Sequence, residues 1–183
     1  NYTCTITDAN ACTITASVTV TQPTALSLTS SQVNQLCNGG NTGSATVNVS
    51  GGTPTYSYAW APSGGTGSTE NGLTAGNYTC TITDANGCII TQTFAITEPT
   101  LLSVTTTTVS STCGNANGSS TANVLGGTPI YSYSWSSGGN AATENNLAAG
   151  SYTIIITDAN GCTAQDIATI SNLGSPTVII TSS

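Results

Sequence analysis

The sequence repeats itself about every 75 residues, and this period limits the folds that are open to the chain. The segment Asn77–Cys88 differs from Asn1–Cys12 only in having Gly87 in place of Ala11. A more divergent third copy is Ser151–Cys162. Self-similarity at a fixed period indicates an array of like units. A unit of this length is large enough to be a small domain with its own core.

A second repeated block sets the limits of the units. Gly51–Trp60 (GGTPTYSYAW) corresponds to Gly126–Trp135 (GGTPIYSYSW). We expect the end of one repeat, two complete repeats and the first strand of another, and we interpret the chain as a window on a longer array. The predicted limits are 1–22, 23–98, 99–173 and 174–183. The junctions are short and contain proline, which predicts a semi-rigid rod.

The composition argues against several functions. The chain has no Lys, Arg or His, and its seven acids give a net charge of −7. Nucleic-acid binding needs cations that neutralise phosphates, and an anionic membrane surface repels such a chain. No apolar run approaches the roughly 20 residues that cross a bilayer. An imidazole base, a Lys nucleophile and an Arg clamp are all absent, so we expect no enzyme.

Within one unit, the residue pattern is that of short strands separated by turns. Residues 101–109, 120–125 and 152–157 are rich in β-branched side chains or alternate in polarity, while Gly126–Pro129 and the Asn-Gly pair at 160–161 are turn signals. No stretch has a helical period. About seven short strands with turns every 8–12 residues predict an all-β fold of tandem immunoglobulin-like β-sandwiches.

Aromatic residues recur on one predicted strand of each unit. By the period of two, they share one face. The residues are Tyr56, Tyr58, Trp60, Tyr131, Tyr133 and Trp135. Immunoglobulin-like sandwiches bury a Trp on this strand, and Leu73–Tyr78 and Leu147–Tyr152 resemble a tyrosine corner. We favour a role in the core, with a glycan-stacking platform as the alternative.

Seven cysteines at regular spacing indicate disulfides and an oxidising compartment. Ile154 stands where the preceding repeat has Cys80, so Cys162 does not need a partner at that position. The spacing favours one disulfide inside each repeat: Cys37–Cys88 and Cys113–Cys162, with Cys12 pairing upstream. The alternative pairs, Cys12–Cys37 and Cys88–Cys113, would join neighbouring repeats, and sequence alone does not fix connectivity.

The remaining cysteine position is filled by Cys4, Cys80 and Ile154 in the successive copies. Cys and Ile replace one another mainly in a dry core. We therefore expect Cys4 and Cys80 to be buried thiols outside any disulfide, acting as small hydrophobic side chains.

Three acids are candidates for calcium ligands: Asp84, Glu98 and Asp158. Calcium takes 6–8 oxygen ligands, whereas each of these places offers one carboxylate with amides and carbonyls. The turn itself explains an Asp followed by Asn, because both side chains bond their own backbone. We expect neither a metal nor another cofactor.

Several sequence motifs together resemble the SprB-type repeat, which is named for the large gliding adhesin of Bacteroidota. They are Cys37–Val47 (CNGGNTGSATV), Gly51–Trp60, Leu73–Tyr78 and Thr83–Cys88. The resemblance implies immunoglobulin-like repeats in very long surface proteins, export by a type IX route, and roles in surface filaments, adhesion and gliding motility. It implies no catalysis. Two features depart from the pattern: the extra cysteine at positions 4 and 80, and the loss of all Lys, Arg and His.

These observations lead to three functional hypotheses for an extracellular or cell-surface protein. The first is a semi-rigid, disulfide-stapled stalk of a bacterial adhesin or filament, whose partners are the neighbouring repeats. The second is a module that binds surface polysaccharide through its loops or aromatic strand. The third is a fibre in which copies pack laterally, since the low charge opposes close approach only weakly.

Overall fold

The computed structural model describes residues 1–174, and these residues form strands and turns only. No helix capable of crossing a membrane occurs among them. The segment 174–183, expected to begin another repeat, lies outside the described residues from position 175 onward.

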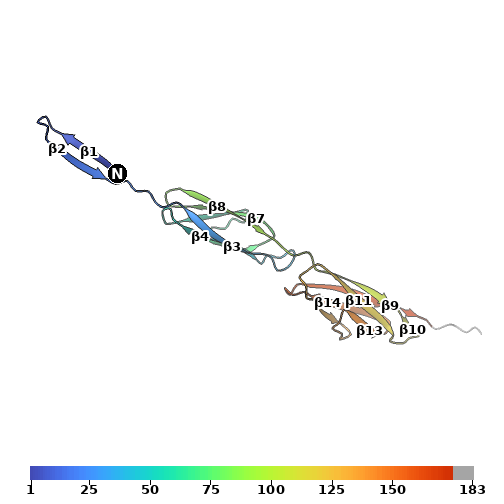
Figure 1. Ribbon diagram of the computed structural model, residues 1–183. Helices are drawn as coiled ribbons and strands as arrows, with labels where there is room; N and C mark the ends of the chain where they lie inside the picture. The colour runs from blue at the N-terminus through green and yellow to red at the C-terminus, as the bar shows by residue number, and fades with distance from the viewer. Residues whose placement is uncertain (175–183) are drawn as a thin grey trace, which may run out of the picture. The chain divides into compact units, whose positions relative to one another are not determined.

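In chain order the strands are β1 (Tyr2–Thr7), β2 (Thr13–Val18), β3 (Ser27–Val33), β4 (Gly43–Ser50), β5 (Ser57–Ala61), β6 (Thr69–Leu73), β7 (Gly76–Thr83), β8 (Ile89–Ile96), β9 (Ser103–Val109), β10 (Ser111–Thr112), β11 (Gly118–Leu125), β12 (Ser132–Trp135), β13 (Thr143–Leu147), β14 (Gly150–Thr157), β15 (Thr163–Ile170) and β16 (Asn172–Leu173) (Figure 1).

Residues 103–170 form two antiparallel sheets of three strands. One sheet has the order β13-β11-β9 and the other the order β12-β14-β15. In an immunoglobulin-like sandwich, strands A, B and E share one sheet while C, F and G share the other. Taking β9, β11, β12, β13, β14 and β15 as A, B, C, E, F and G gives the same order. The predicted all-β, immunoglobulin-like fold is confirmed.

The core of this sandwich draws side chains from both sheets. Its fully buried members include Ile154 and Ile156 of β14 and Ala168 of β15, each 0% exposed. Trp135 at the end of β12 packs into the same cluster, together with Val104 of β9. Alternation of the side chains along each strand brings these residues to one face, since successive residues point to opposite sides of a sheet.

The tyrosine corner predicted at Leu147–Tyr152 is present. The hydroxyl of Tyr152 donates a hydrogen bond to the carbonyl oxygen of Ala148, at 3.1 Å. Leu147 is buried immediately before the corner. This bond holds the chain as it enters β14, which is the strand that leads to the turn at Asp158.

The strands of residues 27–96 repeat this arrangement. They form sheets of order β3-β4-β6 and β5-β7-β8. Trp60 of β5 lies opposite Cys80 of β7 in the antiparallel register, just as Trp135 lies opposite Ile154. Cys80 is 0% exposed, as is Ile154. The prediction of a buried thiol at Cys80 therefore agrees with its position, because the strand pairing puts it against the buried indole.

The hairpin β1–β2 has a different environment from its sequence copies. β1 and β2 pair from Tyr2↔Val18 to Thr7↔Thr13 (Figure 1). Every residue of both strands is exposed. In the described part of the chain no second sheet covers this hairpin. The prediction that Cys4 is buried is wrong, because the sequence that buries Cys80 gives an exposed side chain when the opposing sheet is missing.

Contacts divide the chain into two compact units. The first comprises Asn1–Ser31, Thr46–Thr69 and Tyr78–Thr93, and the second comprises Gln32–Ala45, Glu70–Asn77 and the residues from Phe94 onward. The repeat limits drawn from the sequence stay predictions.

Candidate functional site

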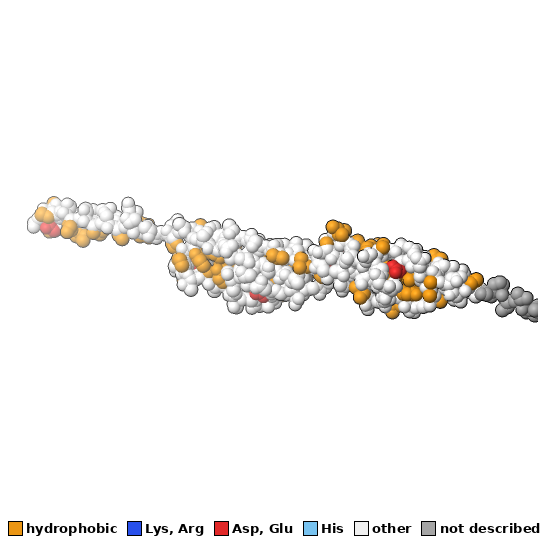
Figure 2. Space-filling model, turned by 90° about the horizontal axis from the view of Figure 1, so that it is seen from below, with side chains coloured by type: hydrophobic (Ala, Val, Ile, Leu, Met, Phe, Trp, Pro, Cys, Tyr) orange, Lys and Arg blue, Asp and Glu red, His pale blue; other side chains and the backbone are white. Residues whose placement is uncertain are grey.

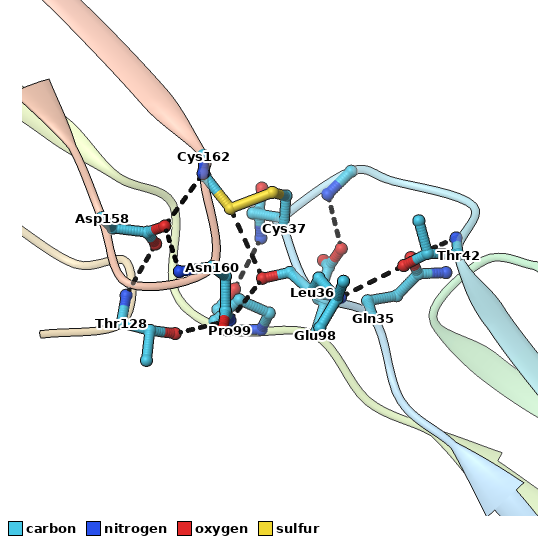
Figure 3. The surroundings of a disulfide bond; sticks show 12 residues. Gln35, Leu36, Cys37, Thr42, Glu98, Pro99, Thr128, Asp158, Asn160 and Cys162 are labelled. Atoms are coloured by element: carbon cyan, nitrogen blue, oxygen red, sulfur yellow. Dashed lines mark hydrogen bonds between the residues drawn. A yellow bond between two sulfur atoms is a disulfide. The ribbon is translucent and has the colours of Figure 1, made fainter.

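A disulfide bond between Cys37 and Cys162 is the most distinctive site of the second unit (Figure 3). The two Cα atoms are 5.7 Å apart, and the cysteines are separated by 125 residues of sequence. Cys37 belongs to the predicted repeat 23–98, whereas Cys162 belongs to the predicted repeat 99–173. The bond therefore links consecutive sequence repeats rather than closing one of them.

This pairing corrects the one favoured by the sequence. The pairs Cys37–Cys88 and Cys113–Cys162 do not form, and neither does the alternative set Cys12–Cys37 and Cys88–Cys113. Apart from Cys37 and Cys162, every cysteine of the described chain lies outside a disulfide. Cys88 and Cys113 are both exposed.

Strand length explains why Cys113 cannot reach Cys162. The backbone N–H of Cys113 donates to the carbonyl oxygen of Leu173, at 3.0 Å, beyond the end of β15. Cys162 immediately precedes the start of β15. An eight-residue strand spans about 26 Å, whereas a disulfide needs Cα atoms within about 7 Å. Cys37 and Cys88 occupy the same sequence positions in the preceding repeat, so the argument applies to them also.

The Cys162 side of the site is a turn held by one buried carboxylate. Asp158 is 5% exposed. Its Oδ1 accepts hydrogen bonds from the backbone N–H groups of Asn160 and Cys162, each at 2.9 Å, and its Oδ2 accepts one from Thr128 at 2.8 Å. We call Thr128, Asp158, Asn160 and Cys162 the Asp158 cradle. These donors, first that of Thr128, hold the pKa of Asp158 below its ordinary value of 3.8.

Asn160 connects the Asp158 cradle to the segment that carries Cys37. Its side-chain amide donates to the carbonyl oxygen of Leu36 at 2.9 Å and to Thr128 Oγ1 at 3.0 Å. Cys162 Sγ also lies 3.4 Å from the carbonyl oxygen of Leu36. The disulfide is therefore accompanied by a direct hydrogen bond to the backbone of the residue before Cys37 (Figure 3).

The segment Gln35–Thr42, here called the Cys37 loop, is fixed by its own polar side chains. Gln35 is buried, and its Oε1 accepts from the backbone N–H of Thr42 at 2.8 Å. Glu98 Oε2 accepts from the backbone N–H of Gly39 at 2.6 Å. Asn38 donates from its amide to the carbonyl oxygen of Pro99 at 3.1 Å. The loop thus holds Cys37 in place through contacts to both sides of the cysteine.

The calcium candidates have local roles in the structure. Asp158 accepts three backbone N–H bonds, and Asp84 accepts the same three from Thr53, Asn86 and Cys88. Glu98 accepts the bond from Gly39. Among residues 1–174, no three His, Cys, Asp or Glu side chains gather as metal ligands. The bonds that Asp84 accepts from Asn86 and Cys88, and that Asp158 accepts from Asn160 and Cys162, are the turn contacts that the sequence suggested.

On the aromatic strand of each repeat, the last aromatic residue is a buried Trp, and the tyrosines that precede it are half-buried. Trp60 and Trp135 are each 3% exposed, and their Nε1 atoms donate to the carbonyl oxygens of Gly67 and Ala141. The tyrosines 56, 58, 131 and 133 are half-buried. Tyr131 and Tyr133 pack against the core cluster, and the Tyr131 hydroxyl donates to the carbonyl oxygen of Gly126 at 2.7 Å. Tyr56 donates to Gly51 in the same way, at 2.6 Å.

The structure also shows which contributors the sequence did not reveal. Gln35, Leu36 and Asn160 all support the disulfide, but none was identified as a site residue. The signal for Asn160 was present, since an Asn stands two residues before the cysteine in all three copies of the turn. Leu36 contributes its backbone carbonyl oxygen, and because every residue has one, no residue pattern can identify this contact.

The strand order, the buried Trp135 and the tyrosine corner define the chain as a tandem immunoglobulin-like β-sandwich protein. The model of one family, the SprB repeat, matches residues 29–66 and 105–140. The resemblance to the SprB-type repeat is thereby confirmed at two places, one in each predicted complete repeat. No curated protein sequence matches the chain.

Solved structures of immunoglobulin-domain proteins are similar at low identity. One is a structure described as the structural basis for Dscam isoform specificity, with 14% identity, coverage of 89% of this chain and 51% of that chain, and a TM-score of 0.35. Another is the mouse nectin-like molecule 4 ectodomain, with 12% identity, 82% and 66% coverage, and a TM-score of 0.36. The chain thus spans about half the length of the first structure.

Proposed function

We propose that the chain is a structural segment of a bacterial surface adhesin or extracellular filament, in which consecutive immunoglobulin-like repeats are joined covalently into a stalk. The observation that carries this proposal is the Cys37–Cys162 bond, which links residues of two consecutive repeats. Structural disulfides persist in oxidising surroundings, so the same observation supports a location outside the cytoplasm. The SprB-repeat matches support a role in surface adhesion.

The bond stabilises a chain whose side chains cannot form ion pairs with one another. Across a sequence separation of 125 residues, the chain-entropy model gives about 5 kcal/mol, and loops this long benefit most. Without any Lys, Arg or His, Asp and Glu side chains cannot form ion pairs with other side chains. Figure 2 shows the acidic side chains as separate spots on the visible face.

Catalysis is not part of the proposal. Asp84 and Asp158 have their carboxylates occupied by backbone N–H groups, and a nucleophile such as Cys88 or Cys113 lacks an imidazole that could act as its base. Glycan stacking on the aromatic strand is not favoured either, since Trp60 and Trp135 are buried and Tyr131 and Tyr133 pack against the core cluster. Polysaccharide binding and lateral packing of copies stay predictions without a specific observation behind them.

The proposal is tested by locating the protein and mapping its disulfide in the native material. Immunogold electron microscopy with an antibody to this chain should label filaments outside intact producing cells. Peptide mapping of the same material without reductant should recover Cys37 joined to Cys162. Label confined to the cell interior, or reduced Cys37 and Cys162 in surface-exposed protein, would overturn the proposal.

A further inference from the structure

The Cys37 loop keeps its shape through hydrogen bonds that do not involve a sulfur atom. The backbone N–H of Gln35 donates to the carbonyl oxygen of Thr97 at 2.9 Å, one residue beyond the end of β8. The side-chain Oε1 of Gln35 accepts from the N–H and the hydroxyl of Thr42, at 2.8 Å and 3.1 Å. Thr42 Oγ1 in turn accepts from the N–H of Leu36 at 3.2 Å. These bonds fix Leu36, whose carbonyl oxygen faces the Asp158 cradle, and they do not depend on the oxidation of Cys37.

The Asp158 cradle has a copy in the first unit whose cysteine, Cys88, lies outside a disulfide. The carboxylate of this copy accepts the same three backbone N–H bonds. Its Asn side-chain amide donates to a Thr hydroxyl at 2.7 Å, as the Asn160 amide does at 3.0 Å. The residues of the copy are Thr53, Asp84, Asn86 and Cys88. The cradle and the direction of its Asn amide therefore form without a sulfur–sulfur bond.

The carbonyl oxygen of Leu36 is the point at which the Cys37 loop meets the Asp158 cradle. The Asn160 amide nitrogen lies 2.9 Å from this oxygen, and Cys162 Sγ lies 3.4 Å from it. A reduced Cys162 carries an S–H group, which is a weak donor, so the same oxygen can then accept two hydrogen bonds. Reduction therefore removes the sulfur–sulfur bond but no hydrogen bond of the site.

Chain length alone would keep Cys37 and Cys162 apart. Their separation is 125 residues, whereas Cys12 lies 25 residues from Cys37. The probability of closing a loop falls with about the −3/2 power of its length, so in an unfolded chain Cys12 meets Cys37 about tenfold more often than Cys162 does. The Cys37–Cys162 bond therefore forms between thiols that the folded chain holds together.

We propose that the Cys37 loop stays docked on the Asp158 cradle when the disulfide is reduced, and that Asn160 is the positioning residue that keeps Cys37 and Cys162 within reach of each other. The site is then a clasp that closes again at the same two cysteines after each reduction. The inference rests on the proposed function, because it concerns the same bond between consecutive repeats. It adds that this bond re-forms without the help of a second protein.

Closing the clasp requires an oxidant, which we take to be a small-molecule disulfide. A cavity of about 320 Å³ beside the bond is lined by residues that include Cys37, Leu101 and Cys162, so a small molecule can approach either sulfur. The Cys37 thiolate attacks the small disulfide and releases one small thiolate. The Cys162 thiolate then attacks Cys37 Sγ and releases the other. Two protein thiols are oxidised, one small disulfide is reduced to two thiols, and the two protein protons go to the released thiolates.

Docking is tested by NMR on the chain reduced with dithiothreitol, through the exchange of side-chain amide protons with solvent. Asn160→Ala identifies the Asn160 signals. Asn86 is the matched control, because its amide donates to Thr53 and has no counterpart of Leu36 among the described residues. One proton of Asn86 should exchange freely, whereas both protons of Asn160 should be protected, the second about fivefold through its hydrogen bond to Leu36. Free exchange of one Asn160 amide proton in the reduced chain would overturn the docking.

Positioning is tested by adding oxidised glutathione at about 0.1 mM to the reduced chain, where held thiols have an effective concentration of at least millimolar order. Samples are quenched with acid, and pepsin fragments are mapped by mass spectrometry. When half of Cys37 has reacted, its glutathione adduct should be about tenfold less abundant than that of the exposed Cys88, because Cys162 displaces the glutathione. In urea the two adducts should be similar. Similar adducts in the folded chain would overturn the clasp.

The role of Asn160 itself is tested in the same experiment with Asn160→Asp. Asp keeps the size of the side chain and suits the turn, but it points a carboxylate oxygen at the Leu36 carbonyl oxygen in place of a donor. The Cys37 adduct should rise about fivefold, since one hydrogen bond is lost and two acceptors face each other. Asn86→Asp makes the same change beside Thr53 and should leave the Cys37 adduct unchanged. An unaltered Cys37 adduct in Asn160→Asp would contradict the positioning role.

The outcomes separate this inference from the proposed function. Absence of the Cys37–Cys162 bond from native material contradicts the stalk. Its presence there, together with free exchange of an Asn160 amide proton in the reduced chain, contradicts only the clasp.

Discussion

At the scale of single residues, Ser120 of β11 places a polar hydroxyl group in the buried interior. It is 0% exposed, and its Oγ has no hydrogen-bond partner among the described residues. The corresponding residue of the preceding repeat is Ala45, also 0% exposed. We predict that Ser120→Ala raises the free energy of unfolding by about 1 kcal/mol, because an unpaired buried hydroxyl is removed. Thermal unfolding should show a rise of about 4–8 °C, while Ser119→Ala next to it should show little change.

Gly126 is a position where a side chain has no room. Its φ is +69°, and a Cβ would lie 2.0 Å from the carbonyl oxygen of Leu101. Gly114 has a φ of +71° with nothing within 4 Å of such a Cβ. Gly114→Ala should therefore lower the free energy of unfolding by about 1 kcal/mol, because Ala disfavours the left-handed conformation. Gly126→Ala should lower it by at least about 2 kcal/mol more, because its Cβ would also overlap the carbonyl oxygen of Leu101. Equal melting temperatures for the two variants would contradict the close approach of these backbones.

The stability of the turn at Asp158 should depend on pH. Its folded-state pKa is lowered below 3.8, first by the Thr128 N–H, so the stability it provides is present above the unfolded-state pKa. That stability is lost as the pH falls from about 4 through the folded-state pKa. Melting temperatures of the chain should fall over this range, and Asp158→Asn should flatten the fall. Asp8→Asn, which changes the same turn in the exposed hairpin, should leave the pH profile of the sandwiches unaltered.

At the scale of elements, the hairpin β1–β2 and the strand β7 give a comparison within one molecule. Asn1–Cys12 and Asn77–Cys88 are nearly identical in sequence, but the side chains of β1 are exposed while Tyr78, Cys80 and Ile82 are buried. An isolated two-stranded hairpin is at best marginally stable in water. We predict that amides of Tyr2–Thr7 exchange with solvent much faster than those of β7, as measured by hydrogen–deuterium exchange with peptide analysis. Similar protection of both segments would show that some other surface covers the hairpin.

The same elements show how far the sequence could predict the structure. The strands, the buried Trp135 and the tyrosine corner at Tyr152 followed from alternation and turn signals, which are local and repeated. The exposure of Cys4 could not follow, since it depends on an opposing sheet and not on the residues around it. The Cys37–Cys162 pair could not be predicted either, because it depends on which ends of two repeats lie together.

At the scale of the whole chain, the disulfide sets how far the protein can be stretched. The bond spans a sequence separation of 125 residues, which extend by about 410–450 Å when fully pulled out. In single-molecule force spectroscopy with handles at the two ends, we predict that this length is hidden in the oxidised chain and appears after addition of reductant. Cys37→Ser should show the longer extension without reductant. Equal extension before and after reduction would contradict the bond.

Between Cys37 and Cys162 the covalent structure is a closed ring, and this has a consequence for damage. A protease that cuts the backbone anywhere inside the ring opens it, but residues 1–37 remain joined to residues 162–183 through the two sulfur atoms. Further cuts inside the ring do not separate those ends. The absence of Lys and Arg already leaves trypsin without a site. Over this stretch, only chemical reduction of the sulfur bridge breaks the continuity of the molecule once its backbone has been severed.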